Sequence, residues 1–196
     1  MKLTPFTIIY LAGLVSMSVI RGWYSVKGAR KRVKNRESKG LDALLMGISS
    51  LGFILPLTYI FSSWIDFADY GLPPVMGWFG AVVFISGHLL LWKAHIDLGT
   101  GWRKLIEITE GHELVTDGVF KHLRHPIYSA HLIWGLGQAL LFANWLAGWS
   151  LLIAGIPLLC YRIPLEERMM LAEFGEDYRS YMESTGSLLP RIKRAR

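Results

Sequence analysis

The longest uncharged stretch of the chain limits its possible folds more than any other feature. Residues 126–161 contain no aspartate, glutamate, lysine or arginine over 36 positions. As one helix, this stretch would be roughly 54 Å long at 1.5 Å per residue, whereas the hydrocarbon core of a bilayer is only ~30 Å thick. It must therefore fold back on itself. Residues 144–148 (NWLAG) are the expected tip of a membrane hairpin.

Three further apolar runs precede the hairpin, and 52% of the chain is hydrophobic, which is too apolar for a soluble domain of 196 residues. The first run is interpreted as a retained helix, because it lacks a convincing small-residue cleavage site. Pro56 is expected to kink the second. We predict an all-α integral membrane protein that forms one domain over residues 1–196. Its five transmembrane helices are expected at about 3–20, 43–65, 75–95, 126–143 and 146–162.

The distribution of positive charge predicts the orientation in the membrane. Residues 21–39, 93–125 and 162–196 hold eight, five and seven lysines and arginines, which is 20 of the 21 in the chain. The positive-inside rule then places these segments and the carboxyl terminus in the cytoplasm and the amino terminus outside. The net charge of +6 is thus attributed to topology and not to nucleic-acid binding. The tail, residues 163–196, predicts an amphipathic helix with a break near Gly175, lying on the membrane or on the rest of the protein.

Arg162 and Glu166 are the first candidate site residues. They lie four residues apart at the end of the last span, and this spacing allows both side chains to face the same direction. An arginine at the mouth of an apolar bundle suits a carboxylate or phosphate ligand. The alternative is an interfacial ion pair, or an arginine that reaches lipid phosphates.

The segments GHELV and HLRHPIY supply the second set of candidates. His112, His125 and Tyr128 can line one polar pocket, and Pro126 suits a first helical position that leaves backbone amide donors pointing outward. The alternative is a plain helix start with interfacial aromatic anchoring. Arg124 is interpreted as a basic flank that anchors the helix to lipid phosphates.

Other chemistries find little support in the sequence. His88 and His95 lie seven residues apart on one expected helix, His131 is expected to pack within its helix, and HExxH is absent, so we predict no metal site. The single cysteine, Cys160, forms no intrachain disulfide or thiol cluster. The motifs of Rossmann cofactor sites, serine hydrolases and P-loops are also missing.

The order of motifs resembles the isoprenylcysteine carboxyl methyltransferase family. GHELVTDGVF at 111–120 is followed by RHPIY at 124–128, the apolar hairpin, RIPLEE at 162–167 and EFGEDYRSYMESTGSLLP at 173–190. The resemblance is strong from about residue 99 to 190, and the five-span layout looks like that of the prokaryotic members. Members of this family are integral membrane enzymes that methylate a carboxylate with S-adenosylmethionine and release S-adenosylhomocysteine.

The resemblance implies a role for particular residues, in a pocket formed by the 99–128 segment and the tail. Arg162 would bind the substrate carboxylate, and Glu166 would help to complete the catalytic site. Phe120 stands where many members have a tyrosine, and Leu105 stands where eukaryotic members have a glutamine that contacts the cofactor. The implied cofactor contacts are His112, Glu113, Leu114, Val115, Phe120, His125, Pro126, Ile127, Tyr128 and Glu166.

The expected reaction is methyl esterification of a prenylated cysteine or a similar lipophilic acceptor. A carboxylate is already ionised at neutral pH, so the transfer requires no general base and no metal. It requires proximity, alignment and desolvation. A site at the membrane edge suits both partners, because a lipid-linked acceptor arrives from the bilayer and the cofactor from the cytoplasm.

Three alternative functions remain open at this stage. A phospholipid or amine N-methyltransferase would use a neutral nitrogen nucleophile, and Arg162 would then bind phosphate. A sterol-type membrane reductase shares HP-x-Y and FG-x-Y-like elements but binds NADPH, and such proteins usually have more spans. A non-enzymatic membrane scaffold would use Arg162 and Glu166 only as a structural pair.

Overall fold

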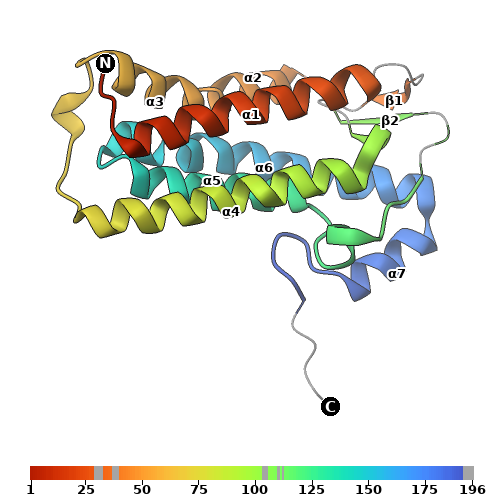
Figure 1. The fold of residues 1–196 in the computed structure, drawn as a ribbon. Coiled ribbons are helices and arrows are strands. Elements are labelled where there is room, and N and C mark those ends of the chain that lie inside the picture. Colours follow the sequence, from red (N-terminus) through yellow and green to blue (C-terminus); the bar gives the residue numbers. More distant parts are fainter. Residues whose placement is uncertain (29–32, 37–39, 103–105, 110, 112, 192–196) are drawn as a thin grey trace.

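The computed structural model of the chain describes residues 1–28, 33–36, 40–102, 106–109, 111 and 113–191. This part of the chain is mostly helical, and its long helices run side by side in one bundle (Figure 1). The helices are α1 (Pro5–Gly28), α2 (Gly40–Ser49), α3 (Leu51–Phe61), α4 (Pro74–Leu98), α5 (Pro126–Leu141), α6 (Trp145–Phe174) and α7 (Glu176–Ser184). Three short 3-10 helices connect them, η1 (Asp66–Ala68), η2 (Gly99–Gly101) and η3 (Gly118–Lys121).

Four segments of the described chain are long and apolar enough to cross a membrane, namely Pro5–Lys27, Gly40–Phe61, Pro74–Leu98 and Trp145–Phe174. Large apolar side chains on their outer faces are exposed, as lipid-facing residues should be: Val15 by 64%, Val82 by 65% and Ile153 by 70%. The membrane-helical class is therefore confirmed. The prediction of five spanning helices is not, because α5 has only 16 residues, fewer than the ~20 that usually span.

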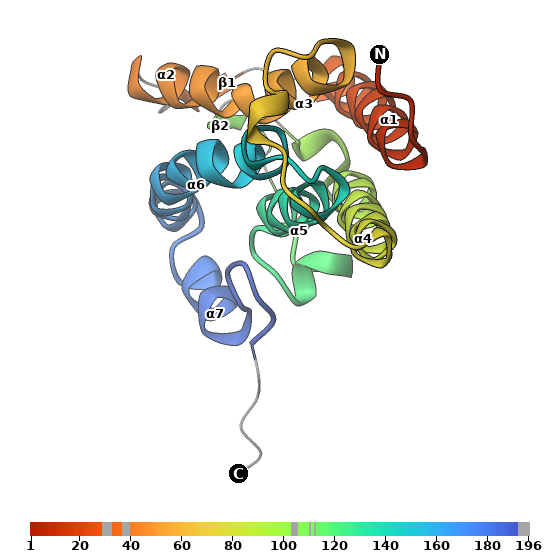
Figure 2. The same cartoon turned by 90° about the vertical axis from the view of Figure 1, so that its left-hand side faces the viewer.

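The short helix α5 lies between α4 and α6, as the end-on view in Figure 2 shows. Its contact with α4 depends on glycines. A Cβ atom added at Gly87 of α4 would lie 2.8 Å from the backbone nitrogen of Trp134, and one at Gly137 of α5 would lie 2.5 Å from that of Phe84. Small residues allow this close approach of two helix backbones, which is the main source of helix association in lipid.

The second predicted span is interrupted at Ser50, between α2 and α3, and Pro56 lies inside α3. The Ser50 hydroxyl donates back to the carbonyl oxygen of Gly47 at 2.5 Å, and such back-bonding bends helices. Pro56 lacks the N–H that would donate to the carbonyl oxygen of Gly52. The side-chain amide of Gln138 donates to that oxygen instead, at 3.2 Å, so the backbone group stays satisfied within the bundle.

The predicted fold-back is confirmed, but its turn lies at residues 142–144, earlier than the predicted 144–148, because Trp145 already begins α6. The fully buried Asn144 caps α6, and its side-chain oxygen accepts from the N–H groups of Leu146 and Ala147 at 3.0 and 2.8 Å. Its amide nitrogen donates to the carbonyl oxygen of Ile65 at 2.7 Å. One side chain thus joins the hairpin to the connection between α3 and α4.

The tail differs from its prediction. Helix α6 continues to Phe174, so the first part of the tail extends the last span instead of forming a separate helix. At 30 residues, α6 is about 45 Å long. The predicted break occurs at Gly175, which has a φ of 55°. The all-α prediction also missed a two-stranded antiparallel sheet between β1 (Val33–Arg36) and β2 (Glu107–Thr109).

The sheet, η3 and α7 all lie at the end of the bundle where α1 and α4 end and α5 begins (Figure 1). Lys34 of β1 bonds Glu173 near the end of α6 at 2.8 Å. Polar segments far apart in the sequence are thus assembled at one end of an apolar bundle.

We expect the Gly137→Ala variant to be less stable than the wild type by roughly 1–3 kcal/mol, because the added methyl group would collide with the backbone of α4. Thermal unfolding in detergent measures this effect. The matched control is Gly47→Ala in α2, where an added Cβ atom meets nothing within 4 Å. Equal melting temperatures for the two variants would contradict the close-packing account of the α4–α5 contact.

Candidate active site

A cavity of about 490 Å³ opens at the polar end of the bundle. Helices α1, α2, α5 and α6 and the loop before α5 all contribute to its walls. Every candidate site residue that the structure describes lines it, namely Glu113, Leu114, Val115, Phe120, His125, Pro126, Ile127, Tyr128, Arg162 and Glu166. His112 and Leu105 lie outside the described residues.

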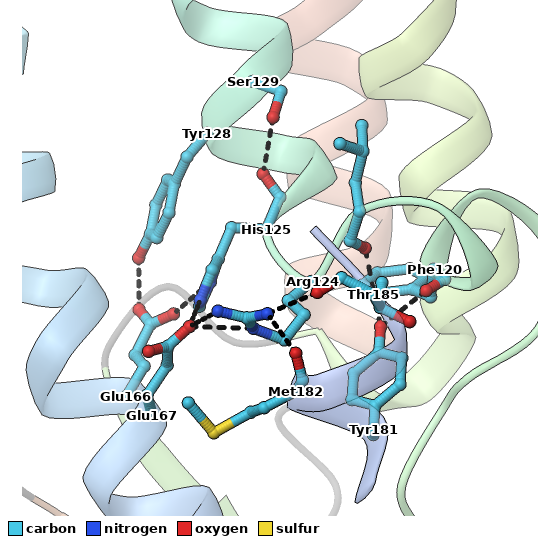
Figure 3. Close-up of polar contacts among 11 residues, drawn as sticks. Phe120, Arg124, His125, Tyr128, Ser129, Glu166, Glu167, Tyr181, Met182 and Thr185 are labelled. Atoms are coloured by element: carbon cyan, nitrogen blue, oxygen red, sulfur yellow. Dashed lines mark hydrogen bonds and ion pairs between the residues drawn. The ribbon is translucent and has the colours of Figure 1, made fainter. Parts of the chain in front are cut away.

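One wall of the cavity is a polar network between the start of α5 and the second half of α6 (Figure 3). The Nε2 atom of His125 lies 3.1 Å from Oε1 of Glu167, and its Nδ1 atom lies 3.6 Å from Oε2 of Glu166. The Tyr128 hydroxyl donates to Glu166. The imidazole and the Tyr128 ring are stacked, with centroids 5.7 Å apart. Two aromatic rings and two carboxylates therefore hold one another in fixed orientations.

Arg124 completes this network, and its predicted role as a lipid anchor is wrong. Its Nε atom donates to Oε1 of Glu167 at 2.9 Å. Its Nη1 atom donates to the carbonyl oxygens of Met182, at 3.1 Å, and Thr185 (Figure 3). A guanidinium has five donors in a fixed fork, and three partners inside the protein use this geometry. Arg124 joins α6 to the last turn of α7 and to the residue that follows it.

Residues that follow α7 hold the loop before α5 in place through hydrogen bonds. The backbone N–H groups of Arg124 and His125 donate to the carbonyl oxygens of Gly186, at 2.8 Å, and Ser187, at 3.1 Å. Burial raises the pKa of Tyr181 to about 12, so its hydroxyl stays protonated and donates to the carbonyl oxygen of Phe120 at 2.6 Å. The tail therefore contributes to the site by positioning its residues.

The electrostatic state of His125 follows from this network. Burial disfavours the charged imidazolium, but the hydrogen bonds and charges of Glu166 and Glu167 outweigh burial and raise the pKa of His125 above its ordinary value of 6.5. A protonated His125 donates from both ring nitrogens, which matches the carboxylate oxygens on its two sides.

Arg162 occupies the wall nearer α2. Its Nε and Nη2 atoms donate to the two carboxylate oxygens of Asp42 at 2.7 and 2.9 Å, and Nη2 also lies 2.8 Å from the sulfur of Met46. The Asp42 side chain is 1% exposed. Sequence reasoning missed this partner. The available signal was a lone aspartate just before an apolar run, because a carboxylate at such a position requires a cation inside the protein.

The loop before α5 is fixed from α4. Oδ2 of Asp97 accepts from the N–H of Val119 at 2.9 Å. Gly118 has a φ of 59°, and a Cβ atom there would lie 2.1 Å from the Asp97 carboxylate, so only glycine fits. Phe120 follows at 7% exposure, with its ring in the cavity wall.

The remaining histidines form no metal site within the described part of the chain, where no group of three or more histidine, cysteine, aspartate or glutamate side chains could hold an ion. His88 bonds the hydroxyl of Ser16 at 2.9 Å. His95 and His131 bond carbonyl oxygens one turn earlier in their own helices, at 2.8 and 2.7 Å. Only His131 of these three lines the cavity.

The fold and the cavity define an intramembrane helical protein with a ligand-sized site at one end of its bundle. Residues 80–172 match the model of the isoprenylcysteine carboxyl methyltransferase (ICMT) family. The resemblance indicated by the motifs is therefore confirmed.

Named relatives agree with this family match. The chain is 34% identical over 114 residues to protein-S-isoprenylcysteine O-methyltransferase B of Arabidopsis thaliana, covering 57% of this chain and 58% of that relative. It is 26% identical over 194 residues to the enzyme of the same type from Dictyostelium discoideum, covering 94% of this chain and 77% of that relative. The chain thus spans less than three-fifths of the Arabidopsis protein's length.

A solved structure of a eukaryotic intramembrane Ras methyltransferase, ICMT, has the same fold. The TM-score is 0.58 at 23% identity, with 99% of this chain and 71% of that one covered. At this identity, the likeness bears on the fold alone.

The raised pKa of His125 predicts a pH-dependent contribution to stability. A group whose pKa is higher in the folded state stabilises the fold below its unfolded pKa of ~6.5, and this contribution is lost as the pH rises through the folded value. The difference in melting temperature between the wild type and His125→Gln should be largest below about pH 6.5 and should shrink at higher pH. Thermal unfolding in detergent, from about pH 5.5 to about pH 9, measures this difference.

The exposed His122 provides the control, because His122→Gln should leave the melting temperature unchanged. A difference between the wild type and His125→Gln that grows with rising pH would contradict the assigned network.

Proposed function

We propose that this chain is a membrane methyltransferase that transfers the methyl group of S-adenosylmethionine to the carboxylate of a prenylated cysteine or a similar lipophilic acceptor. The observation that carries the proposal is the convergence of two motif segments, 113–128 and 162–167, on one cavity within the segment that matches the ICMT family.

The size and lining of the cavity fit a cofactor of this class. A volume of about 490 Å³ lies within the roughly 300–1,000 Å³ usual for small-molecule sites. Phe120 and the rings of His125 and Tyr128 offer flat surfaces to a base, and Glu113 and Glu166 offer acceptors for amino and hydroxyl groups. S-Adenosylmethionine, when bound, supplies a sulfonium methyl group that an acceptor oxygen takes while the carbon–sulfur electron pair returns to sulfur.

The residues of this chain have tasks of binding and orientation in the proposal. We assign the acceptor carboxylate to Arg162, whose two hydrogen bonds to the Asp42 carboxylate fix the plane of its guanidinium. Glu166, oriented by Tyr128 and His125, completes the site on the next turn of α6. An ionised carboxylate needs no proton acceptor, so alignment and exclusion of water are the protein's contribution.

Methyl transfer from labelled S-adenosylmethionine to a panel of acceptors tests the proposal. The panel contains N-acetyl-S-farnesylcysteine, its carboxamide, a fatty acid, phosphatidylethanolamine and a thiol. We expect label in the farnesylcysteine as a base-labile ester, and none in the carboxamide or the lipid amine. Label in phosphatidylethanolamine would favour the N-methyltransferase alternative. Thermal protection by NADPH, without protection by S-adenosylhomocysteine, would favour the reductase.

A pair of tyrosine variants checks that the activity belongs to this cavity. Tyr128→Phe removes the hydroxyl that donates to Glu166 and should weaken S-adenosylhomocysteine binding roughly 2- to 10-fold. Tyr70→Phe removes a hydroxyl that bonds the carbonyl oxygen of Ala139 near the other end of α5, and it should leave binding unchanged. An equal loss of S-adenosylhomocysteine affinity in the two variants would contradict binding of this ligand in the cavity.

We further propose that the polar end of the bundle faces the cytoplasm. The positive-inside rule supports this orientation, because the loops that meet at this end carry most of the lysines and arginines. Cytoplasmic S-adenosylmethionine would then reach the cavity directly, while the acceptor enters from the bilayer.

Cysteine labelling in intact cells tests the orientation. After Cys160→Ala removes the only native cysteine, Trp64→Cys and Glu176→Cys place single thiols at opposite ends of the bundle. Both positions are about 80% exposed, so accessibility does not bias the comparison. An impermeant maleimide should label Trp64→Cys in intact cells and Glu176→Cys only after permeabilisation. The reverse pattern would overturn the orientation.

A further inference from the structure

Arg21 is a charged residue in the apolar helix α1, and its side chain lines the cavity. Its guanidinium lies over the ring of Trp102, 5.2 Å from the ring centroid, and its Nη1 atom lies 3.4 Å from Nε2 of His131. An arginine within a span is costly in lipid and is therefore a candidate functional residue.

His131 cannot neutralise this charge. Its Nδ1 atom lies 2.7 Å from the carbonyl oxygen of Ile127, which only accepts hydrogen bonds, so Nδ1 carries the hydrogen. Its Nε2 atom faces Arg21, which only donates, so Nε2 is the unprotonated acceptor. His131 is thus the neutral tautomer, and Arg21 keeps its full positive charge beside the cavity.

The carboxylates around the cavity have other partners or lie apart from Arg21. Asp42 bonds Arg162, and Glu166 and Glu167 bond the residues at the start of α5. Glu107 and Glu113 also line the cavity. Within the described ranges, neither they nor any other carboxylate forms an ion pair with Arg21. Among the described residues, three arginines line this cavity, and Arg21 differs from Arg124 and Arg162 in having no carboxylate partner.

The lack of a carboxylate partner for Arg21 matters for the binding of an acceptor carboxylate, because Arg162 is already paired with Asp42. Two opposite unit charges in bidentate contact already balance each other, so Arg162 can orient an entering carboxylate but adds no net positive charge. An ionised carboxylate that leaves water for an apolar cavity requires a compensating cation. Arg21 is in a position to supply it.

We propose that Arg21 acts with Arg162 on the carboxylate of the methyl acceptor, and that Arg21 provides the positive charge that holds this carboxylate in the cavity. This inference rests on the proposed function, in which two carboxylates enter the site, one on the acceptor and one on the cofactor.

The position of Arg21 favours the acceptor as the source. Its contact His131 lies about one turn further along α5 than Tyr128, and Met17, one turn earlier in α1, lines the same cavity with an apolar side chain. Arg21 therefore lies beside an apolar part of the cavity lining. A lipophilic acceptor entering from the bilayer would meet it first.

Binding measurements on the full chain in nanodiscs test this inference without requiring turnover. The acceptor probes are N-acetyl-S-farnesylcysteine and its carboxamide, and the cofactor probes are S-adenosylhomocysteine and 5′-methylthioadenosine, which lacks the amino-acid group. The variants are Arg21→Gln and the control Lys27→Gln, on the same helix, where the lysine lies 4.8 Å from the Trp23 ring centroid. Lys27 is not among the residues that line the cavity.

We expect the wild type and Lys27→Gln to bind the farnesylcysteine acid roughly 10- to 100-fold more tightly than its carboxamide, the range for hydrogen bonds to a charged group. Arg21→Gln should lose this preference while its affinity for S-adenosylhomocysteine stays the same, which also reports that the site is folded. Arg21→Lys keeps the positive charge but lacks the planar guanidinium, so it should retain part of the preference for the acid. This variant is the control for misfolding of Arg21→Gln.

The outcomes separate this inference from the proposed function. A preference for the acid that survives in Arg21→Gln, or is absent from the wild type, overturns the inference. Weaker S-adenosylhomocysteine binding with unchanged methylthioadenosine binding would assign Arg21 to the cofactor and overturn it as well. A preference that depends on Arg21 in a protein that transfers no methyl group would support the carboxylate site and contradict the proposed function.

Discussion

The bidentate pair between Asp42 and Arg162 holds together the end of the bundle at which the cavity forms. It joins the first turn of α2 to the middle of α6 across 120 positions of sequence, and the carboxylate is almost completely buried. Removing one partner of such a pair leaves an uncompensated charge and costs about 3–5 kcal/mol. The following turn of α6 carries Glu166 and Glu167, whose partners are on α5 and in the loop before it. A single helix thus fixes both walls.

This arrangement explains how a site for polar chemistry can exist at the edge of an apolar bundle. The charged pairs in the walls, Asp42 with Arg162 and Glu167 with Arg124, bond one another, so the cost of removing these side chains from water is offset inside the protein. The helices themselves pack through glycines at the α4–α5 contact and need no polar bonds there. The polar interactions are concentrated where the loops, the sheet and the tail meet.

Sequence patterns predicted much of this architecture, because lipid leaves a chain few choices. Apolar runs long enough to span fold as helices, and the uncharged stretch 126–161 had to fold back, which it does at Asn144. The candidate site residues of the motifs that the structure describes all line the cavity. Hydropathy could not reveal that α6 continues to Phe174 or that Ser50 interrupts the second span, because these outcomes depend on tertiary contacts and local hydroxyl bonds. The partners of Arg124 and Arg162 are 43 and 120 positions away, beyond the reach of any local spacing rule.

We propose that one cavity, between the loop before α5 and the second half of α6, holds the methyl donor. An experimental structure with S-adenosylhomocysteine would test this proposal. We expect the ligand to lie in this cavity, with its base against the rings of Phe120, His125 or Tyr128 and its sulfur facing the side of Arg21 and Arg162. A ligand bound outside the cavity, or separated from these arginines by the wall of α5, would contradict the account.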